Sequence, residues 1–198
     1  MLRKEDKKFF LDYVRTNIEA ALDDNLVHKL VKYDDNKPES AHHKQGAFVT
    51  LHTKEGALRG CIGTFEETRP LIDVLKDMSI AAAFEDPRFP SVESIEELKN
   101  LKIEISVLSK RVEIKHPKDI IIGKHGLYIS ENKTWPYRSG VLLPQVATEY
   151  EWTVAEFLTH TCLKARLGEH DWINPANENG DFPNSLKVEI FSAEVFSE

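Results

Sequence analysis

The residues best suited to chemistry in this chain lie in one short stretch, Leu58-Arg59-Gly60-Cys61-Ile62-Gly63. The thiol of Cys61 can act as a nucleophile, and a nearby cation such as Arg59 lowers the pKa of a thiol and favours its reactive form. The guanidinium of Arg59 could equally hold a carboxylate or phosphate of a ligand. Gly60 and Gly63 allow a ligand or another backbone to come close. The stretch therefore predicts a binding site, with Cys61 as the candidate catalytic nucleophile.

A second interpretation of Cys61 stays open, since a small buried cysteine can simply fill space beside glycines. On an alternating strand, Arg59 and Cys61 share one face and Ile62 takes the opposite one. If the apolar side faces the core, the thiol and the guanidinium both look out on the accessible side. Cys162 falls on the apolar side of a predicted helix, and we expect it to be structural.

A proline-stiffened turn supplies further candidate binding residues. Glu85, Asp86 and Arg88 place two acids and a cation on this turn, an arrangement suited to holding a polar group. The alternative is a local pairing of Asp86 with Arg88 that staples the end of a helix.

Two more candidates come from later in the chain. His125 lies in a glycine-flanked turn, from which its side chain could project into a cleft, and it is a candidate binding residue. His52 precedes Cys61 by one predicted strand, but the face on which it lies depends on the register of the hairpin. Gln145 follows the end of a short apolar strand, where clefts often lie, and it is equally part of a plain connection.

The sequence contains no motif that indicates a metal or nucleotide cofactor. The chain lacks Cys-x-x-Cys, His-Glu-x-x-His, Gly-x-Gly-x-x-Gly and Gly-x-x-x-x-Gly-Lys-Ser/Thr, so we predict no metal centre and no cofactor. The net charge of −7 argues against general binding of nucleic acid. Residues 98–138 are locally basic, with nine Lys/Arg against four Asp/Glu, which is more typical of a solvated face.

The composition is that of a globular protein, with 41% hydrophobic and 30% charged residues. No apolar stretch approaches the ~20 residues that span a bilayer, and the first residues do not resemble an export signal. We therefore expect a cytoplasmic protein without membrane contact, in which both cysteines are reduced.

The spacing of apolar residues predicts a mixture of helices and hairpins, and hence an α+β fold. Helices are expected at 5–22 and 68–84, after a capping box at Ser94, and from a second capping box at Thr153 to a stop at Gly168. Strands are expected at 47–53, 57–65, 101–108, 120–122, 127–130, 141–143 and 186–196.

Together these pieces resemble the AMMECR-one domain family (AmmeMemoRadiSam system protein A-like). The hexapeptide 58–63 matches the family signature residue for residue. The match continues, in order, through 82–90, 104–109, 125–127, 142–147 and 162–165, and so covers nearly the whole chain. One departure is Arg166, where prokaryotic relatives usually have glycine.

The resemblance implies one AMMECR-one domain over residues 1–198, two-lobed, with mixed or antiparallel sheets and flanking helices. The larger lobe would come from both chain ends, about 1–45 and part of 66–198, and the smaller lobe from a middle segment. The signature hexapeptide would then lie by the cleft between the lobes.

No reaction is established for that family, whose prokaryotic members are often encoded beside, or fused to, a Memo-like protein and a radical S-adenosylmethionine (radical SAM) protein. The resemblance therefore implies these partners and a small-molecule or modification pathway. We expect an enzyme or enzyme component that binds or modifies a small polar or anionic group at the hexapeptide. The alternative is a non-catalytic adaptor or regulatory binding protein linked to nucleic-acid or translation machinery.

Overall fold

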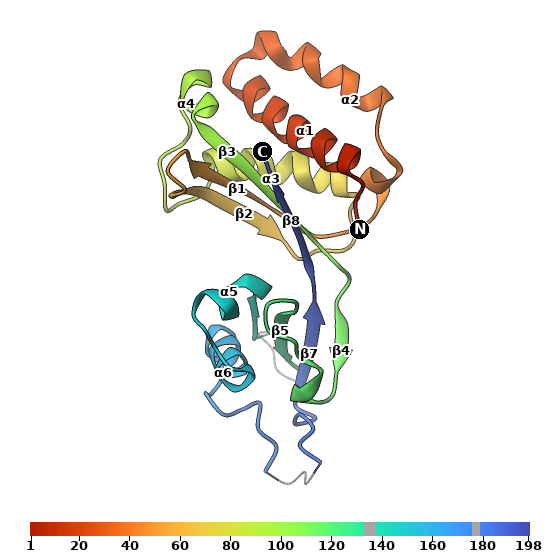
Figure 1. The fold of residues 1–198 in the computed structure, drawn as a ribbon, viewed down its shortest axis with the longest axis vertical. Coiled ribbons are helices and arrows are strands. Elements are labelled where there is room, and N and C mark those ends of the chain that lie inside the picture. The colour runs from red at the N-terminus through yellow and green to blue at the C-terminus, as the bar shows by residue number, and fades with distance from the viewer. Residues whose placement is uncertain (133–137, 176–178) are drawn as a thin grey trace. The chain divides into compact units, whose positions relative to one another are not determined.

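The structure is a computed structural model that describes residues 1–132, 138–175 and 179–198. The chain forms two compact units, one made of residues 1–108 and 194–198 and the other of residues 109–193 (Figure 1). Each is built on a four-stranded antiparallel sheet with helices packed on it, which confirms the expected α+β class. Within the described ranges, no helix has both the length and the apolar character needed to cross a membrane.

The first unit contains the sheet with strand order β2-β1-β3-β8. Its strands are β1 (Ala47–Thr53), β2 (Leu58–Thr64), β3 (Leu101–Leu108) and β8 (Ala193–Ser197). Its helices are α1 (Lys4–Leu22), α2 (Val31–Asp35), α3 (Leu71–Phe84) and α4 (Ile95–Lys99), with 3-10 turns at Asp24–Leu30 and Glu39–His42. Helices α1 and α3 pack against each other and on one face of the sheet (Figure 1).

The core of the first unit lies between that sheet face and the two helices. Val49 and Leu51 from β1 and Ile103 from β3 are fully buried there, against Phe10 and Val14 of α1. Every second strand residue contributes to this core, because successive side chains of a strand point to opposite faces. The predicted helix at 5–22 and strands at 47–53 and 101–108 are confirmed.

The opposite face of this sheet is rich in polar side chains, and we call it the polar face. It carries Thr50 and His52 of β1, Cys61 of β2, and Glu104 and Ser106 of β3, as the cross-strand pairing shows.

The hairpin of β1 and β2 was predicted, but its register contains a bulge that was not. Leu51 pairs with Gly60 and His52 pairs with Leu58, so Arg59 is an extra residue in β2. A bulge of this kind redirects the side chain that it carries. The simple alternation expected from the sequence therefore fails at Arg59.

The second unit has the sheet order β4-β7-β5-β6. Its strands are β4 (Val112–Ile114), β5 (Gly126–Glu131), β6 (Ser139–Leu142) and β7 (Leu186–Phe191), and its helices are α5 (Pro144–Glu149) and α6 (Val154–Lys164), with a 3-10 turn at Pro117–Asp119. Helix α6 packs on β5 and β6 and closes a core that includes Phe157, Leu158 and Cys162. Cys162 is fully buried, which confirms that it is a core residue.

Two predicted strands were wrong. Residues 120–122 form no strand and lead into a turn, in which the Ile121 carbonyl accepts the backbone N–H of His125 and the Ile121 N–H donates to the His125 ring. The expected strand 186–196 is two strands, β7 and β8, which belong to different sheets. An alternating run of residues looks the same in the sequence whichever sheet it joins. The short strand β4 was not predicted.

Two helix ends also differ from expectation. Helix α3 begins at Leu71 rather than at 68, because Pro70 takes the extended N-cap position. Helix α6 ends at Lys164, before Gly168, with Ala165 as its C-cap. Arg166 then adopts the left-handed conformation, with a φ of 60°. Glycine normally fills this position after a helix, since it has no side chain to strain.

Replacing the strained arginine by glycine tests this helix ending. Because a non-glycine residue pays about 1 kcal/mol for a left-handed φ, we expect Arg166→Gly to raise the free energy of unfolding by about 0.5–1 kcal/mol. Lys164→Gly, two residues earlier within α6, should lower it by a similar amount. Urea denaturation of both variants measures the difference, and destabilisation by Arg166→Gly would contradict this account.

Candidate functional site

The outer side of β2 is the feature that positions Cys61. Strand β2 ends the sheet, so its outward backbone groups have no neighbouring strand. The Cys61 N–H donates instead to Oδ2 of Asp86 at 2.9 Å, and the Cys61 carbonyl accepts a hydrogen bond from Nη2 of Arg88 at 3.2 Å. Two side chains thus take the place of a strand partner and cover an edge that would otherwise be open to pairing.

Asp86 is the centre of this network, and only 4% of its surface is exposed. Its Oδ1 accepts the backbone N–H of Arg88 at 3.1 Å and Nε of Arg88 at 2.9 Å, and its Oδ2 accepts Nη2 of Arg88 at 2.7 Å. These bonds from Arg88 hold the pKa of Asp86 well below its usual range, although burial acts in the opposite direction. The pairing of Asp86 with Arg88 was the alternative expected for this turn. Glu85 is exposed and only its backbone N–H caps α3.

The thiol of Cys61 is half-buried and lies beside two polar groups. The Thr50 hydroxyl, directly opposite on β1, donates to Sγ at 3.3 Å. The pKa of Arg88 is raised, first by its hydrogen bond to Asp86, and the charge of Cys61 contributes in the same direction. The side chain of Arg88 is 54% exposed, and its Nη1 makes no hydrogen bond to any residue of the described ranges. The cation in contact with Cys61 is therefore Arg88, which binds the backbone carbonyl of this residue.

Arg59 was expected to lie beside Cys61, but its guanidinium forms hydrogen bonds with other residues. Its Nε and Nη2 donate to Oε1 of Glu97 at 3.1 and 2.7 Å. Its Nη1 donates to the Pro90 carbonyl at 2.7 Å, and Nη2 also reaches the Ser91 carbonyl at 3.2 Å. The shared face predicted for Arg59 and Cys61 is wrong, because the bulge turns Arg59 towards α4 and the segment before it.

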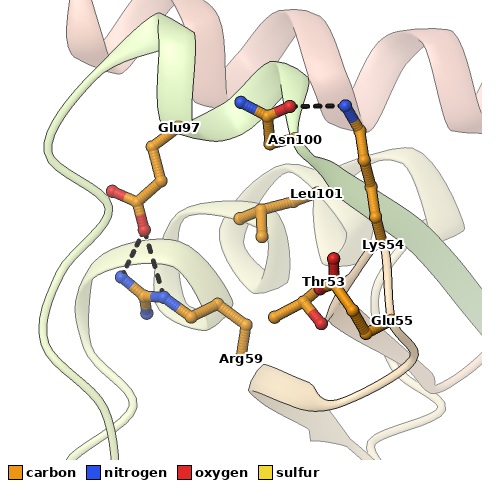
Figure 2. Close-up of a pocket in the computed structure, with 7 residues that line it drawn as sticks. All are labelled: Thr53, Lys54, Glu55, Arg59, Glu97, Asn100 and Leu101. Atoms are coloured by element: carbon orange, nitrogen blue, oxygen red, sulfur yellow. Dashed lines mark hydrogen bonds and ion pairs between the residues drawn. The ribbon is translucent and has the colours of Figure 1, made fainter.

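Arg59 and Glu97 line an open hollow of about 320 Å³ at the turn between β1 and β2 (Figure 2). The other lining residues are Thr53, Lys54, Glu55, Asn100 and Leu101. Lys54 donates to the side-chain oxygen of Asn100, so the polar groups of this hollow pair largely with one another. Cys61 is not among the lining residues.

The ion pair with Arg59 also changes the predicted capping box of α4. Ser94 accepts the N–H of Glu97 at 3.1 Å, which is half of the box. The Glu97 carboxylate binds Arg59 and the N–H of Glu93 instead of returning to Ser94. The box at Thr153 and Glu156 is complete, as predicted.

The two glycines of the hexapeptide are explained by internal packing. A Cβ on Gly60 would lie 2.2 Å from the carbonyl oxygen of Ala82, so the glycine lets α3 approach the sheet. A Cβ on Gly63 would lie 2.2 Å from the ring of Phe48, its cross-strand partner. The sequence predicted that another group comes close to these two glycines. In the structure those groups are Ala82 and Phe48 of the protein itself.

His125 and Gln145 belong to the second unit, whereas the other predicted site residues belong to the first. Nδ1 of His125 accepts the Ile121 N–H at 3.2 Å. Burial, helped by the charge of Lys124, lowers the pKa of His125 and favours its neutral form. Gln145 is half-buried in the first turn of α5. Across the described residues, no three His, Cys, Asp or Glu side chains meet as metal ligands.

Sequence reasoning missed the residues that share a row with the thiol on the polar face. Thr50 pairs with Cys61 on one side and with Glu104 on the other, so the three residues form a row across β2, β1 and β3. The polar positions of each strand could be read from the sequence. The row itself depends on the register of three strands, and one of these lies about 40 residues away in the chain.

Comparison with known proteins agrees with this fold. The AMMECR1 family model matches residues 11–196, and the chain therefore belongs to the AMMECR1 family. Protein MJ0810 of Methanocaldococcus jannaschii is 36% identical, covering 100% of this chain and 92% of its own length. Protein NEQ441 of Nanoarchaeum equitans is 40% identical, covering 83% of this chain and 87% of its own.

A solved structure has the same fold. The crystal structure of the uncharacterised protein PH0010 from Pyrococcus horikoshii matches with a TM-score of 0.80 and 34% identity, over 100% of this chain and 93% of that one. The names of these relatives state no activity, so the family is known and the function has to be argued from the site.

The network around Asp86 makes a prediction about stability. Asp86→Asn keeps the shape of the side chain but removes the charge that binds Arg88, and we expect a loss of about 2 kcal/mol in the free energy of unfolding at pH 7.

The pH dependence of this loss has a definite sign. Because the pKa of Asp86 is lowered on folding, its contribution is present above the ordinary aspartate pKa of about 4 and is lost as the pH falls further. Urea titrations at pH 7, 5 and 3 should therefore show a constant difference between the two proteins at pH 7 and 5, and a smaller one at pH 3. A difference that grows towards acid would contradict the assignment.

Proposed function

We propose that this chain is an enzyme, or a component of an enzyme, that binds a small anionic group at the edge of β2 and uses the Cys61 thiol as a nucleophile. Its pathway would be the one associated with Memo-like and radical SAM proteins, which the family resemblance implies. The observation that carries the proposal is the half-buried Cys61, whose backbone carbonyl is bound by the guanidinium of Arg88.

Arg88 is suited to anion binding because Asp86 fixes the plane of its guanidinium. Two nitrogens, Nε and Nη2, are held by the carboxylate, and the unbound Nη1 is left for a ligand. A guanidinium held in one orientation loses little side-chain entropy on binding. Asp86 also offsets part of the positive charge of Arg88. We therefore expect Arg88 to raise the reaction rate of an anionic reagent a few-fold rather than by orders of magnitude.

A binding protein without a covalent step is the second candidate. It is favoured by the structural tasks of the other motif residues: Arg59 clamps the segment before α4, and Gly60 and Gly63 permit close packing. Cys61→Ser distinguishes the two, since a binding role tolerates the hydroxyl and a nucleophilic role does not.

Alkylation with a matched pair of reagents tests the proposed site. Cys162 is fully buried and burial raises the pKa of its thiol to about 12, so labelling should report Cys61 alone. We expect Arg88→Gln to lower the rate with anionic iodoacetate, relative to neutral iodoacetamide, by about two- to fivefold, the range of an exposed ion pair. Rates are measured by mass spectrometry of the labelled protein.

The control removes the same charge at a distance. Lys99→Gln on α4 should leave the ratio of the two rates unchanged, and Cys61→Ser should abolish labelling. A wild-type thiol that reacts with neither reagent in the folded protein would refute the proposal. An unchanged ratio in Arg88→Gln would remove the anion-binding part of it.

A further inference from the structure

We propose that His52 and Glu104 are the proton-accepting pair of Cys61, so that the polar face carries a Cys–His–Glu arrangement for acyl transfer. The inference rests on the proposed use of Cys61 as a nucleophile and names the base and the substrate class of that same site.

Strand register brings these residues to one place. Thr50 lies opposite Cys61 of β2 and opposite Glu104 of β3. His52 is two residues further along β1, and its pairing with β3 is regular, so it shares the face of Thr50. Diagonal neighbours on one face of a sheet have Cα atoms about 7–8 Å apart, within reach of long side chains. Cys61 lies diagonally across from His52 on this face, and the register shift of the hairpin falls between their two positions.

Two contacts lie within this group, one on each side of β1. The Thr50 hydroxyl lies 3.3 Å from Sγ of Cys61, and Nε2 of His52 lies 3.9 Å from Oε1 of Glu104. The side chains of His52 and Glu104 are each 30% exposed, whereas Thr50 is buried. The group is therefore partly sheltered from water and still open to a small substrate.

The chemistry of each residue fits its role. A nucleophilic thiol needs a base that is held by a third group, and a carboxylate beside an imidazole stabilises the imidazolium that forms. Nδ1 of His52 has no hydrogen-bond partner among the described residues, so one ring nitrogen is free to take a proton while Nε2 faces Glu104. Lys102 is the cross-strand partner of His52 on β3, and it is a second charged residue on this part of the polar face.

The step can be written with every atom accounted for. The Cys61 thiol gives its proton to His52, and Sγ forms a bond to the carbonyl carbon of an ester or thioester. The bond from that carbon to the leaving oxygen or sulfur breaks, and the leaving group takes the proton from the imidazolium. Arg88 would bind an anionic group carried by the acyl donor. Neither an oxidant nor a reductant is required.

The pH dependence of Cys61 alkylation by iodoacetamide tests the inference, using the full-length wild-type protein and His52→Gln, Glu104→Gln and His42→Gln. At pH 7 a free thiol is only a few per cent ionised, so loss of the base in His52→Gln should slow the reaction by about tenfold. Glu104→Gln should slow it by about threefold, because the imidazolium loses its nearby charge. At pH 10, where thiols ionise without help, all four rates should coincide.

The controls separate this inference from the proposed function. His42 is an exposed histidine outside the sheet, and its replacement should leave the profile unchanged. Thermal unfolding monitored by circular dichroism verifies that each variant is folded. If Cys61 alkylates but the His52→Gln profile coincides with that of the wild type, the base assignment is overturned and the nucleophile stands. If the wild-type thiol does not react at any pH, both fail.

Discussion

The carboxylate of Asp86 is the constraint on which the rest of the first unit's site depends. It is buried, and it accepts hydrogen bonds from the backbone of Cys61 and from the backbone and guanidinium of Arg88. A buried charge is tolerated only when it is paired and hydrogen-bonded, and here one bond comes from β2 and three come from Arg88 in the turn after α3. The end of α3, the turn that follows it and the edge strand β2 are thereby held together.

The hexapeptide 58–63 contains residues whose side chains or small size serve the fold and one residue, Cys61, whose thiol lies on the polar face. Arg59 donates hydrogen bonds to Pro90, Ser91 and Glu97. The absence of a side chain at Gly60 and Gly63 leaves space for α3 and for the ring of Phe48. Cys61 uses its backbone for the fold, through Asp86 and Arg88, and keeps its side chain for the polar face.

Parts of this organisation could be predicted from the sequence, because they depend on local patterns. The period of the apolar residues was sufficient for α1, for the hairpin of β1 and β2 and for β3, since each of these is specified by its own alternation. Local polarity also indicated the turn from Glu85 to Arg88. The prediction failed where an outcome depended on a partner distant in the chain, as in the run 186–196, whose two halves join different sheets.

By itself, the sequence determined the family and the α+β class, since residue types and spacings carry that information directly. Only the tertiary structure decided which cation contacts Cys61. A single extra residue in β2 turns Arg59 away, and a buried aspartate 25 positions after Cys61 brings Arg88 to it. The row of Cys61, Thr50 and Glu104 was likewise decided there, because the register of three strands is set by the packing of the whole sheet on its helices.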